Sequence, residues 1–142
     1  MGWSSIGRRI GVVVLALVAA RLVAAGIWPT INDVRTGGTP QYADLQSQRF
    51  AQPYERVYDA VLASARALGW EVTATDRDGG RIDAVDTTRV FRFKDDIAVT
   101  ITRDGGTAIV DVRSHSRIGK GDLGTNARRI RRFQADLARR FT

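Results

Sequence analysis

The stretch Asp111–Phe133, DVRSHSRIGKGDLGTNARRIRRF, changes from the pattern of a strand to that of a helix. Its first residues alternate between polar and apolar side chains, which is typical of a half-buried strand. Closely spaced glycines then indicate a polar loop, and the final residues place apolar side chains at helical spacing. A strand, a loop and an amphipathic helix therefore follow one another here, and His115, the only histidine, lies among them.

Outward from this stretch, the same two periods predict the remaining elements. Alternation and hairpin-type turns predict four strands, at residues 70–75, 81–88, 97–101 and 107–114. Apolar residues at spacings of three and four predict two helices, over residues 53–68 and about 123–140. The arginines of the last helix are expected on its exposed face: Arg128, Arg129, Arg131, Arg132, Arg139 and Arg140.

The order of these elements predicts the fold class. Hairpin-length connections make the sheet antiparallel, and two amphipathic helices need one apolar sheet face to cover them. We therefore expect an α+β domain over residues 53–142, a two-layer α-β-β-β-β-α sandwich with an antiparallel four-stranded sheet. Residues 29–52 show no hydrophobic period and are expected to form an irregular linker.

Residues 1–28 indicate a targeting segment. Arg8 and Arg9 precede the apolar run Ile10–Ala20, and Arg21 follows it. We expect an N-terminal signal-anchor transmembrane helix, in a single-pass protein of the bacterial inner membrane whose domain faces the periplasm. Arg21 would extend to the membrane surface or pair with an acidic group of a membrane-complex partner. A cleaved signal peptide is the alternative.

The composition narrows the kinds of site that the chain can hold. It has no cysteine and one histidine, which excludes disulfides, thiolate zinc sites and cysteine nucleophiles. No cofactor or metal is expected from its motifs. Net charge is +7, and 20 of the 22 basic residues are arginine, which favours bidentate contact with carboxylates and phosphates.

Candidate binding residues gather around the polar loop. Backbone N–H groups at the helix start, together with nearby cations, are expected to form an anion pocket. The alternative is a structural loop in which Asp122 or Thr125 caps the helix and the arginines pair with acidic neighbours such as Asp95 and Asp96. The candidates are Arg113, Ser114, Ser116, Arg117, Gly119, Lys120, Asp122, Asn126 and Arg129. Secondary candidates are Lys94, Asp95, Asp96 and Asp111.

Several motifs resemble one known family. They are INDV at 31–34, ALGWEV at 67–72, GRIDA at 80–84, FKDD at 93–96 and DVRS-S-R-G--DLG-NA-RI at 111–130. Over residues 31–140 the chain resembles the domain of unknown function 1499 family. That family is usually preceded by membrane-spanning or signal segments and has no agreed activity, so the resemblance implies an exported domain without naming a reaction. His115 departs from the family pattern, which argues against a family-wide catalytic role.

These observations favour a non-catalytic binding or accessory module for an envelope lipid, an anionic ligand or a membrane-complex partner. The basic C-terminal region would suit anionic lipid headgroups. The alternative is an envelope hydrolase or metal-assisted enzyme, which requires Asp95, Asp96, Asp111 and Asp122 to converge in a cleft. No nucleic-acid partner is expected, because an exported domain would be separated from nucleic acid. In addition, no aromatic side chains on which bases could stack are interleaved with the arginines.

Overall fold

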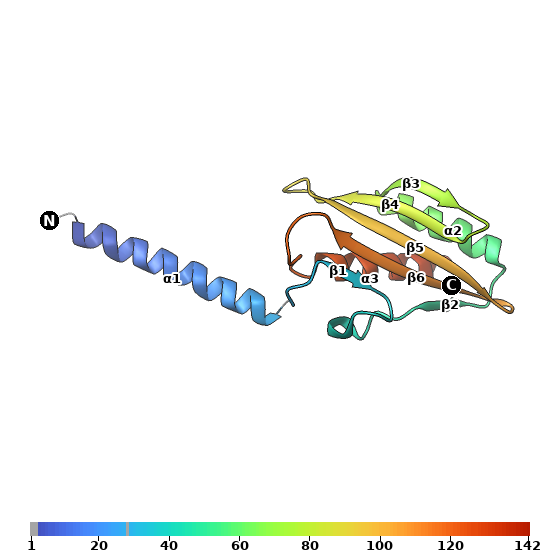
Figure 1. Ribbon diagram of the computed structural model, residues 1–142, viewed down its shortest axis with the longest axis horizontal. Helices are drawn as coiled ribbons and strands as arrows, with labels where there is room; N and C mark the ends of the chain where they lie inside the picture. Colours follow the sequence, from blue (N-terminus) through green and yellow to red (C-terminus); the bar gives the residue numbers. More distant parts are fainter. Residues whose placement is uncertain (1–2, 28) are drawn as a thin grey trace.

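The computed structural model describes residues 3–27 and 29–142 (Figure 1). Three α-helices are present in this part of the chain: α1 (Trp3–Ile27), α2 (Tyr54–Ala67) and α3 (Thr125–Arg139). A short 3-10 helix, η1, spans Pro40–Tyr42. Six strands complete the structure: β1 (Asp33–Arg35), β2 (Gln48–Phe50), β3 (Glu71–Asp76), β4 (Arg81–Thr87), β5 (Lys94–Asp104) and β6 (Thr107–Ser116).

The strands form one antiparallel sheet in the order β1-β6-β5-β4-β3, and β2 also pairs with β6. Strands β1 and β2 share one edge of β6, with Val34 opposite Ser114 and Arg49 opposite Ile109. The sheet therefore has six strands instead of the predicted four, because residues 29–52 supply β1 and β2. Each of these strands has three residues, too few to show an alternating period in the sequence.

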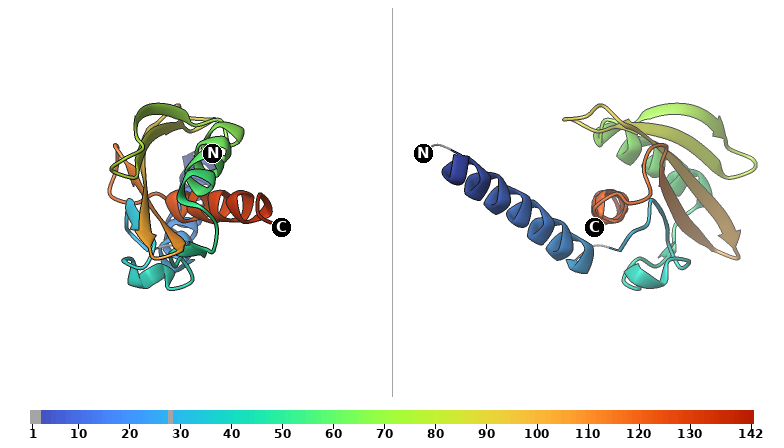
Figure 2. Two further views of the ribbon diagram at one scale, coloured as in Figure 1. Left: turned by 90° about the vertical axis from the view of Figure 1, so that its right-hand side faces the viewer. Right: turned by 60° about the vertical axis from the view of Figure 1, so that its left-hand side comes forward.

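Both α2 and α3 cover the same face of the sheet, as Figure 2 shows. Alternate residues of β5 and β6 point to this face and bury their apolar side chains against the helices. The rings of Trp70 and Phe133 stack here with their centroids 5.2 Å apart. Burial of this apolar surface is the main driving force for holding the two layers together. The opposite face presents polar side chains such as Asp83, Asp96 and Arg113. Figure 2 shows no helix of the described chain over this face.

The N-terminal expectation requires correction. The described side chains of α1, residues 9–23, are exposed to solvent. No helix within residues 3–27 and 29–142 is long and apolar enough to cross a membrane, so the predicted signal-anchor transmembrane helix is wrong. The apolar run Ile10–Ala20 lies between Arg9 and Arg21. It is about 16 Å long as a helix, roughly half of the hydrocarbon core.

The expected location depended on that helix. A single-pass inner-membrane protein with a periplasmic domain requires a spanning segment, so this localisation is overturned by the same finding. The partner contact expected through Arg21 also assumed a membrane anchor and loses its basis.

Candidate functional site

Strand β6 divides the motif residues between the two faces of the sheet. Because side chains alternate along a strand, Ser114 and Ser116 point under α3 and are buried, whereas Arg113 and His115 point to the open face. The residues predicted to form one binding surface therefore lie in different environments.

Arg129 is the centre of a buried polar network, although the sequence places it among exposed arginines. Its side chain is 2% exposed. The Nη2 atom lies 2.6 Å from Oδ2 of Asp95 on β5, and Nε lies 2.7 Å from Oδ2 of Asp86 on β4. Asp86 and Asp95 are directly opposed in the β4–β5 register. Opposed carboxylates repel one another, so the guanidinium between them stabilises this pair of strand ends.

The network continues from Arg129 into β6 and the N-terminal segment. Nη1 of Arg129 donates to Ser114 Oγ at 3.0 Å and to Asn126 Oδ1 at 2.8 Å. Nδ2 of Asn126 donates to Ser116 Oγ at 2.8 Å and to the Asn32 carbonyl at 3.1 Å. The buried polar groups therefore satisfy one another, and they fix the first turns of α3 against the sheet.

Asp122 caps the start of α3. Its Oδ1 accepts a hydrogen bond from the Gly124 N–H at 2.8 Å, and its Oδ2 accepts one from the Asn126 N–H at 2.7 Å. These bonds occupy backbone donors that a helix start otherwise leaves free. Asp122 therefore acts as a helix cap, and its carboxylate occupies the two N–H groups that an anion would need.

The loop before α3 is tied to the N-terminal segment. Nδ2 of Asn32 donates to the Gly119 carbonyl at 2.5 Å, and the Asp122 N–H donates to the Ile31 carbonyl at 3.1 Å. Lys120 is exposed in this loop and forms no ion pair with any described residue.

Two other predicted arginines are paired on the open face of the sheet. Arg113 binds Asp33 through two hydrogen bonds of 2.9 and 2.6 Å, and Arg117 binds Asp96 through contacts of 2.6 to 3.0 Å. The hydrogen-bonded Arg113 guanidinium lowers the pKa of Asp33 below its ordinary value, and Arg117 does the same for the pKa of Asp96. These cations already have carboxylate partners.

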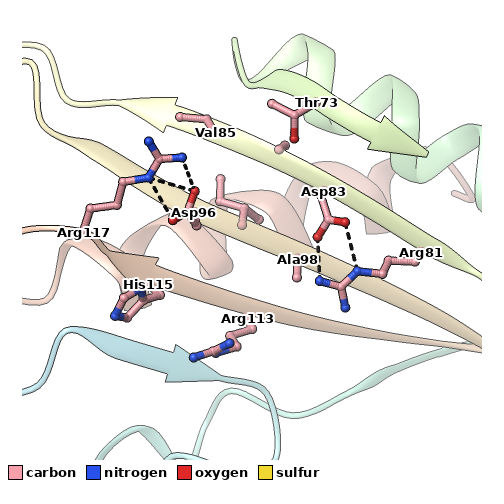
Figure 3. Close-up of a pocket in the computed structure, with 11 residues that line it drawn as sticks. Thr73, Arg81, Asp83, Val85, Asp96, Ala98, Arg113, His115 and Arg117 are labelled. Carbon is pink, nitrogen blue, oxygen red and sulfur yellow. Dashed lines mark hydrogen bonds and ion pairs between the residues drawn. The ribbon is translucent and has the colours of Figure 1, made fainter. Parts of the chain in front are cut away.

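The open face also contains a polar cavity of about 500 Å³ (Figure 3). Arg81 lines it and binds Asp83 at 2.9 and 2.7 Å, so a third arginine is paired. His115 lies beside Arg113 and Arg117 at its edge. With each arginine matched by an aspartate, this cavity has little excess charge with which to attract an anion.

A second cavity lies beside α3 on the helical side of the sheet, and we name it the α3 hollow. It encloses about 410 Å³. Its walls come from the end of α2, the end of β4 and the first turns of α3: Leu68, Gly69, Trp70, Asp86, Thr87, Thr88, Arg89, Thr125, Arg129 and Arg132. Neither Arg89 nor Arg132 is in an ion pair within the described residues. This cavity therefore has uncompensated arginines.

Three of the four charged residues that line the α3 hollow were not among the predicted site residues: Asp86, Arg89 and Arg132. One signal was available, because Thr125, Arg129 and Arg132 follow the four- and three-residue spacing of one helix face. No comparable signal existed for Asp86 and Arg89, because their place beside α3 depends on the packing of elements far apart in the chain.

The four carboxylates of the enzyme alternative lie apart. Asp95 is buried against Arg129, and Asp96 lies on the open face. Asp111 accepts hydrogen bonds from Thr36, at 2.8 Å, and from Ser47; Asp122 caps α3. Lys94, the remaining secondary candidate, is exposed at the start of β5. Among the described residues, no group of three or more metal-ligating side chains could hold a metal ion.

Comparison with known proteins places the chain in a family. No curated protein matches it. The crystal structure of TTHA0849 from Thermus thermophilus is 13% identical, with a TM-score of 0.40 over 76% of this chain and 95% of that chain. The crystal structure of CalU16 from Micromonospora echinospora is 13% identical, with a TM-score of 0.30 over 65% and 83%. The model of the family "Protein of unknown function (DUF1499)" matches residues 25–137. The chain therefore belongs to the DUF1499 family, the one that its motifs resemble.

Proposed function

We propose that the domain is a non-catalytic binding module for a small anion of the phosphate class, held in the α3 hollow. The observation that carries this proposal is the pair of arginines in that cavity. Arg89 and Arg132 are exposed, line the same 410 Å³ cavity and have no ion pair within the described residues. The arginines of the open-face cavity, in contrast, each have a carboxylate.

The donors around the α3 hollow suit phosphate oxygens. Guanidinium groups offer planar, paired N–H donors that match phosphate geometry. Thr88 and Thr125 add hydroxyl groups; Thr88 Oγ1 accepts from the Phe93 N–H at 2.9 Å, and Thr125 Oγ1 accepts from Arg128 at 3.3 Å. Each hydroxyl hydrogen is then available to a ligand. The volume also lies within the range of small-molecule sites.

The buried network supports a binding role more than a catalytic one. Arg129 is buried and lines the α3 hollow, and its hydrogen bonds to Asp86, Asp95, Ser114 and Asn126 hold it in place. A catalytic acid and base would need to reach one reacting atom. The carboxylates Asp96 and Asp111 lie on the opposite face of the sheet, away from this cavity.

The proposal is tested by isothermal titration calorimetry of the full chain with inorganic phosphate and with pyrophosphate. Replacing both Arg89 and Arg132 by glutamine should weaken binding about ten-fold or more, because a hydrogen bond to a charged group contributes about 1.5–3 kcal/mol. The matched control is Arg35→Gln, which removes an exposed arginine of β1 outside the hollow.

Two results would contradict the assignment. If the double variant bound phosphate as tightly as Arg35→Gln did, the α3 hollow would not be the site. If the unaltered chain bound neither probe, the ligand would not belong to the phosphate class.

A further inference from the structure

Two loops lie side by side at one end of the sheet. The first joins β4 to β5, and the second joins β6 to α3. They meet because the start of β5 pairs with the end of β6: Asp95 is opposite Ser116, and the Arg117 N–H donates to the Lys94 carbonyl at 3.3 Å. Figure 1 shows both loops at the end of the domain where the chain from α1 enters. We name residues 88–94 and 117–124, with Arg128 and Arg132, the loop tip.

The loop tip concentrates exposed apolar side chains. Within residues 29–142, which the structure describes in full, every large hydrophobic residue with an exposed side chain lies here: Val90, Phe91, Phe93, Ile118 and Leu123. Val90 and Phe91 are the most exposed, at 81% and 72%. The rings of Phe91 and Phe93 stack on one another, with centroids 5.5 Å apart, rather than on the core. An apolar group of this kind, absent from the rest of the domain surface, indicates a contact site.

Cations surround these apolar side chains. The loop tip contains Arg89, Arg92, Lys94, Lys120, Arg128 and Arg132, and none of them is paired with a carboxylate of the described chain. The nearby carboxylates already have partners, since Asp96 binds Arg117 and Asp122 caps α3. The loop tip is therefore both apolar and strongly positive.

The backbone of each loop contains an unfavourable conformation. Arg92 has φ of 57° and Leu123 has φ of 51°, and they are the only non-glycine residues with positive φ in the described chain. A side chain disfavours this region because of its Cβ atom. Strained positions of this kind tend to gather at functional sites. One such residue in each loop is a second observation that singles out the loop tip.

We propose that the loop tip docks peripherally on an anionic lipid surface. Apolar side chains that project from two adjacent loops can enter the headgroup boundary of a bilayer, and the surrounding cations then lie against lipid phosphates and other anionic groups. This contact is made by the folded domain and needs no spanning helix. The excess of cations around the apolar side chains, unpaired within the described chain, favours an anionic lipid surface as the partner.

The proposal is independent of the phosphate site, although Arg89 and Arg132 border both. Its test therefore uses other residues. The full chain is sedimented with vesicles of phosphatidylcholine alone and of phosphatidylcholine mixed with phosphatidylglycerol. We expect binding to the anionic vesicles and little to the neutral ones.

Two double variants separate the apolar contribution from the charge contribution. Phe91→Ser with Phe93→Ser should weaken binding to anionic vesicles about ten-fold or more. Arg92→Gln with Lys120→Gln should weaken it by roughly the same factor, and added salt should reduce the difference. Because all four residues are exposed, thermal unfolding should remain unchanged.

Two control variants test whether vesicle binding arises from the exposed apolar residues of α1 or from the total positive charge of the chain. Leu15→Ser with Leu17→Ser alters two exposed residues of α1, and Arg35→Gln with Arg66→Gln removes two cations far from the loop tip in sequence. Both controls should bind anionic vesicles as the unaltered chain does. If the loop-tip variants bound as these controls do, or if neutral vesicles bound equally well, the proposal would be overturned.

Self-association and phosphate binding of the same variants provide two further tests of the lipid proposal. If the chain self-associated through Phe91 and Phe93 and bound no vesicles, the loop tip would be an interface between copies, and the lipid proposal would fail. Phosphate titration of the loop-tip variants keeps the two proposals distinct: unchanged phosphate binding with lost vesicle binding supports the lipid surface alone.

Discussion

At the scale of single residues, Arg129 determines how the start of α3 is joined to the sheet. It is the largest fully buried side chain of the described residues, and its guanidinium lies between Asp86 and Asp95. A buried ion pair adds little net stability when it forms, because both charges lose water. Removing one partner is different, since the other charge then stays buried without compensation.

We therefore predict that Arg129→Gln lowers the free energy of unfolding by about 3–5 kcal/mol. The exposed pair of Arg131 with Asp44 supplies the control: Arg131→Gln should cost no more than about 1 kcal/mol. Urea denaturation at neutral pH measures both. Adding Asp95→Asn to Arg129→Gln should recover part of the loss, and the absence of recovery would show that the buried carboxylate is not its cause.

At the scale of elements, β1 depends on contacts beyond its short ladder. It contributes three residues, and Val34 is fully buried against the core. The bidentate pair of Asp33 on β1 with Arg113 on β6 crosses the same two strands on the open face. Backbone pairing, one buried side chain and one ion pair together hold this edge of the sheet.

This ion pair should make the stability of the β1 edge depend on pH. Arg113 lowers the pKa of Asp33 below its ordinary value of 3.8, so the folded state binds its proton less readily than the unfolded state does. The contribution is then complete above about pH 4 and is lost as the pH falls through the lowered pKa. Asp33 is partly exposed, so the contribution is at most about 1 kcal/mol.

Unfolding measurements of the unaltered chain and of Asp33→Asn, each from neutral to strongly acidic pH, test this expectation. The unaltered chain should be the more stable at neutral pH, and the difference should disappear at the acidic end. A difference that stayed constant with pH would mean that Asp33 acts through hydrogen bonding alone.

At the scale of the whole molecule, the folded domain includes residues before position 53, where the hydrophobic pattern of the sequence places its start. Asn32 enters the buried network, and β1 and β2 complete the sheet on β6. The described side chains of α1, in contrast, are exposed and contribute no buried surface. The stable unit is therefore expected to include the residues from about 29 onward.

Truncation distinguishes these two parts of the chain. Deleting residues 1–28 should leave the urea midpoint of unfolding almost unchanged. Deleting residues 1–36 should lower the free energy of unfolding by roughly 3 kcal/mol or more, because it removes the buried Val34 side chain and the β1 ladder. Equal stability of the two truncated chains would show that β1 is dispensable.

The elements with local evidence could be predicted from the sequence. Helices α2 and α3 and strands β3 to β6 have hydrophobic periods long enough to detect, and the motif Asp111–Ile130 is irregular enough to indicate the family. Asp122 was foreseen as an alternative helix cap because capping depends on residues a few positions apart.

The other features could not be predicted from the sequence, because they depend on contacts between residues far apart in the chain. Three-residue strands such as β1 and β2 have no period of their own and exist because the edge of β6 accepts them. An arginine on a helix is expected in solvent, and Arg129 is buried because β4 and β5 bring Asp86 and Asp95 to it. The loop tip likewise forms because antiparallel pairing brings residues 88–94 beside residues 117–124.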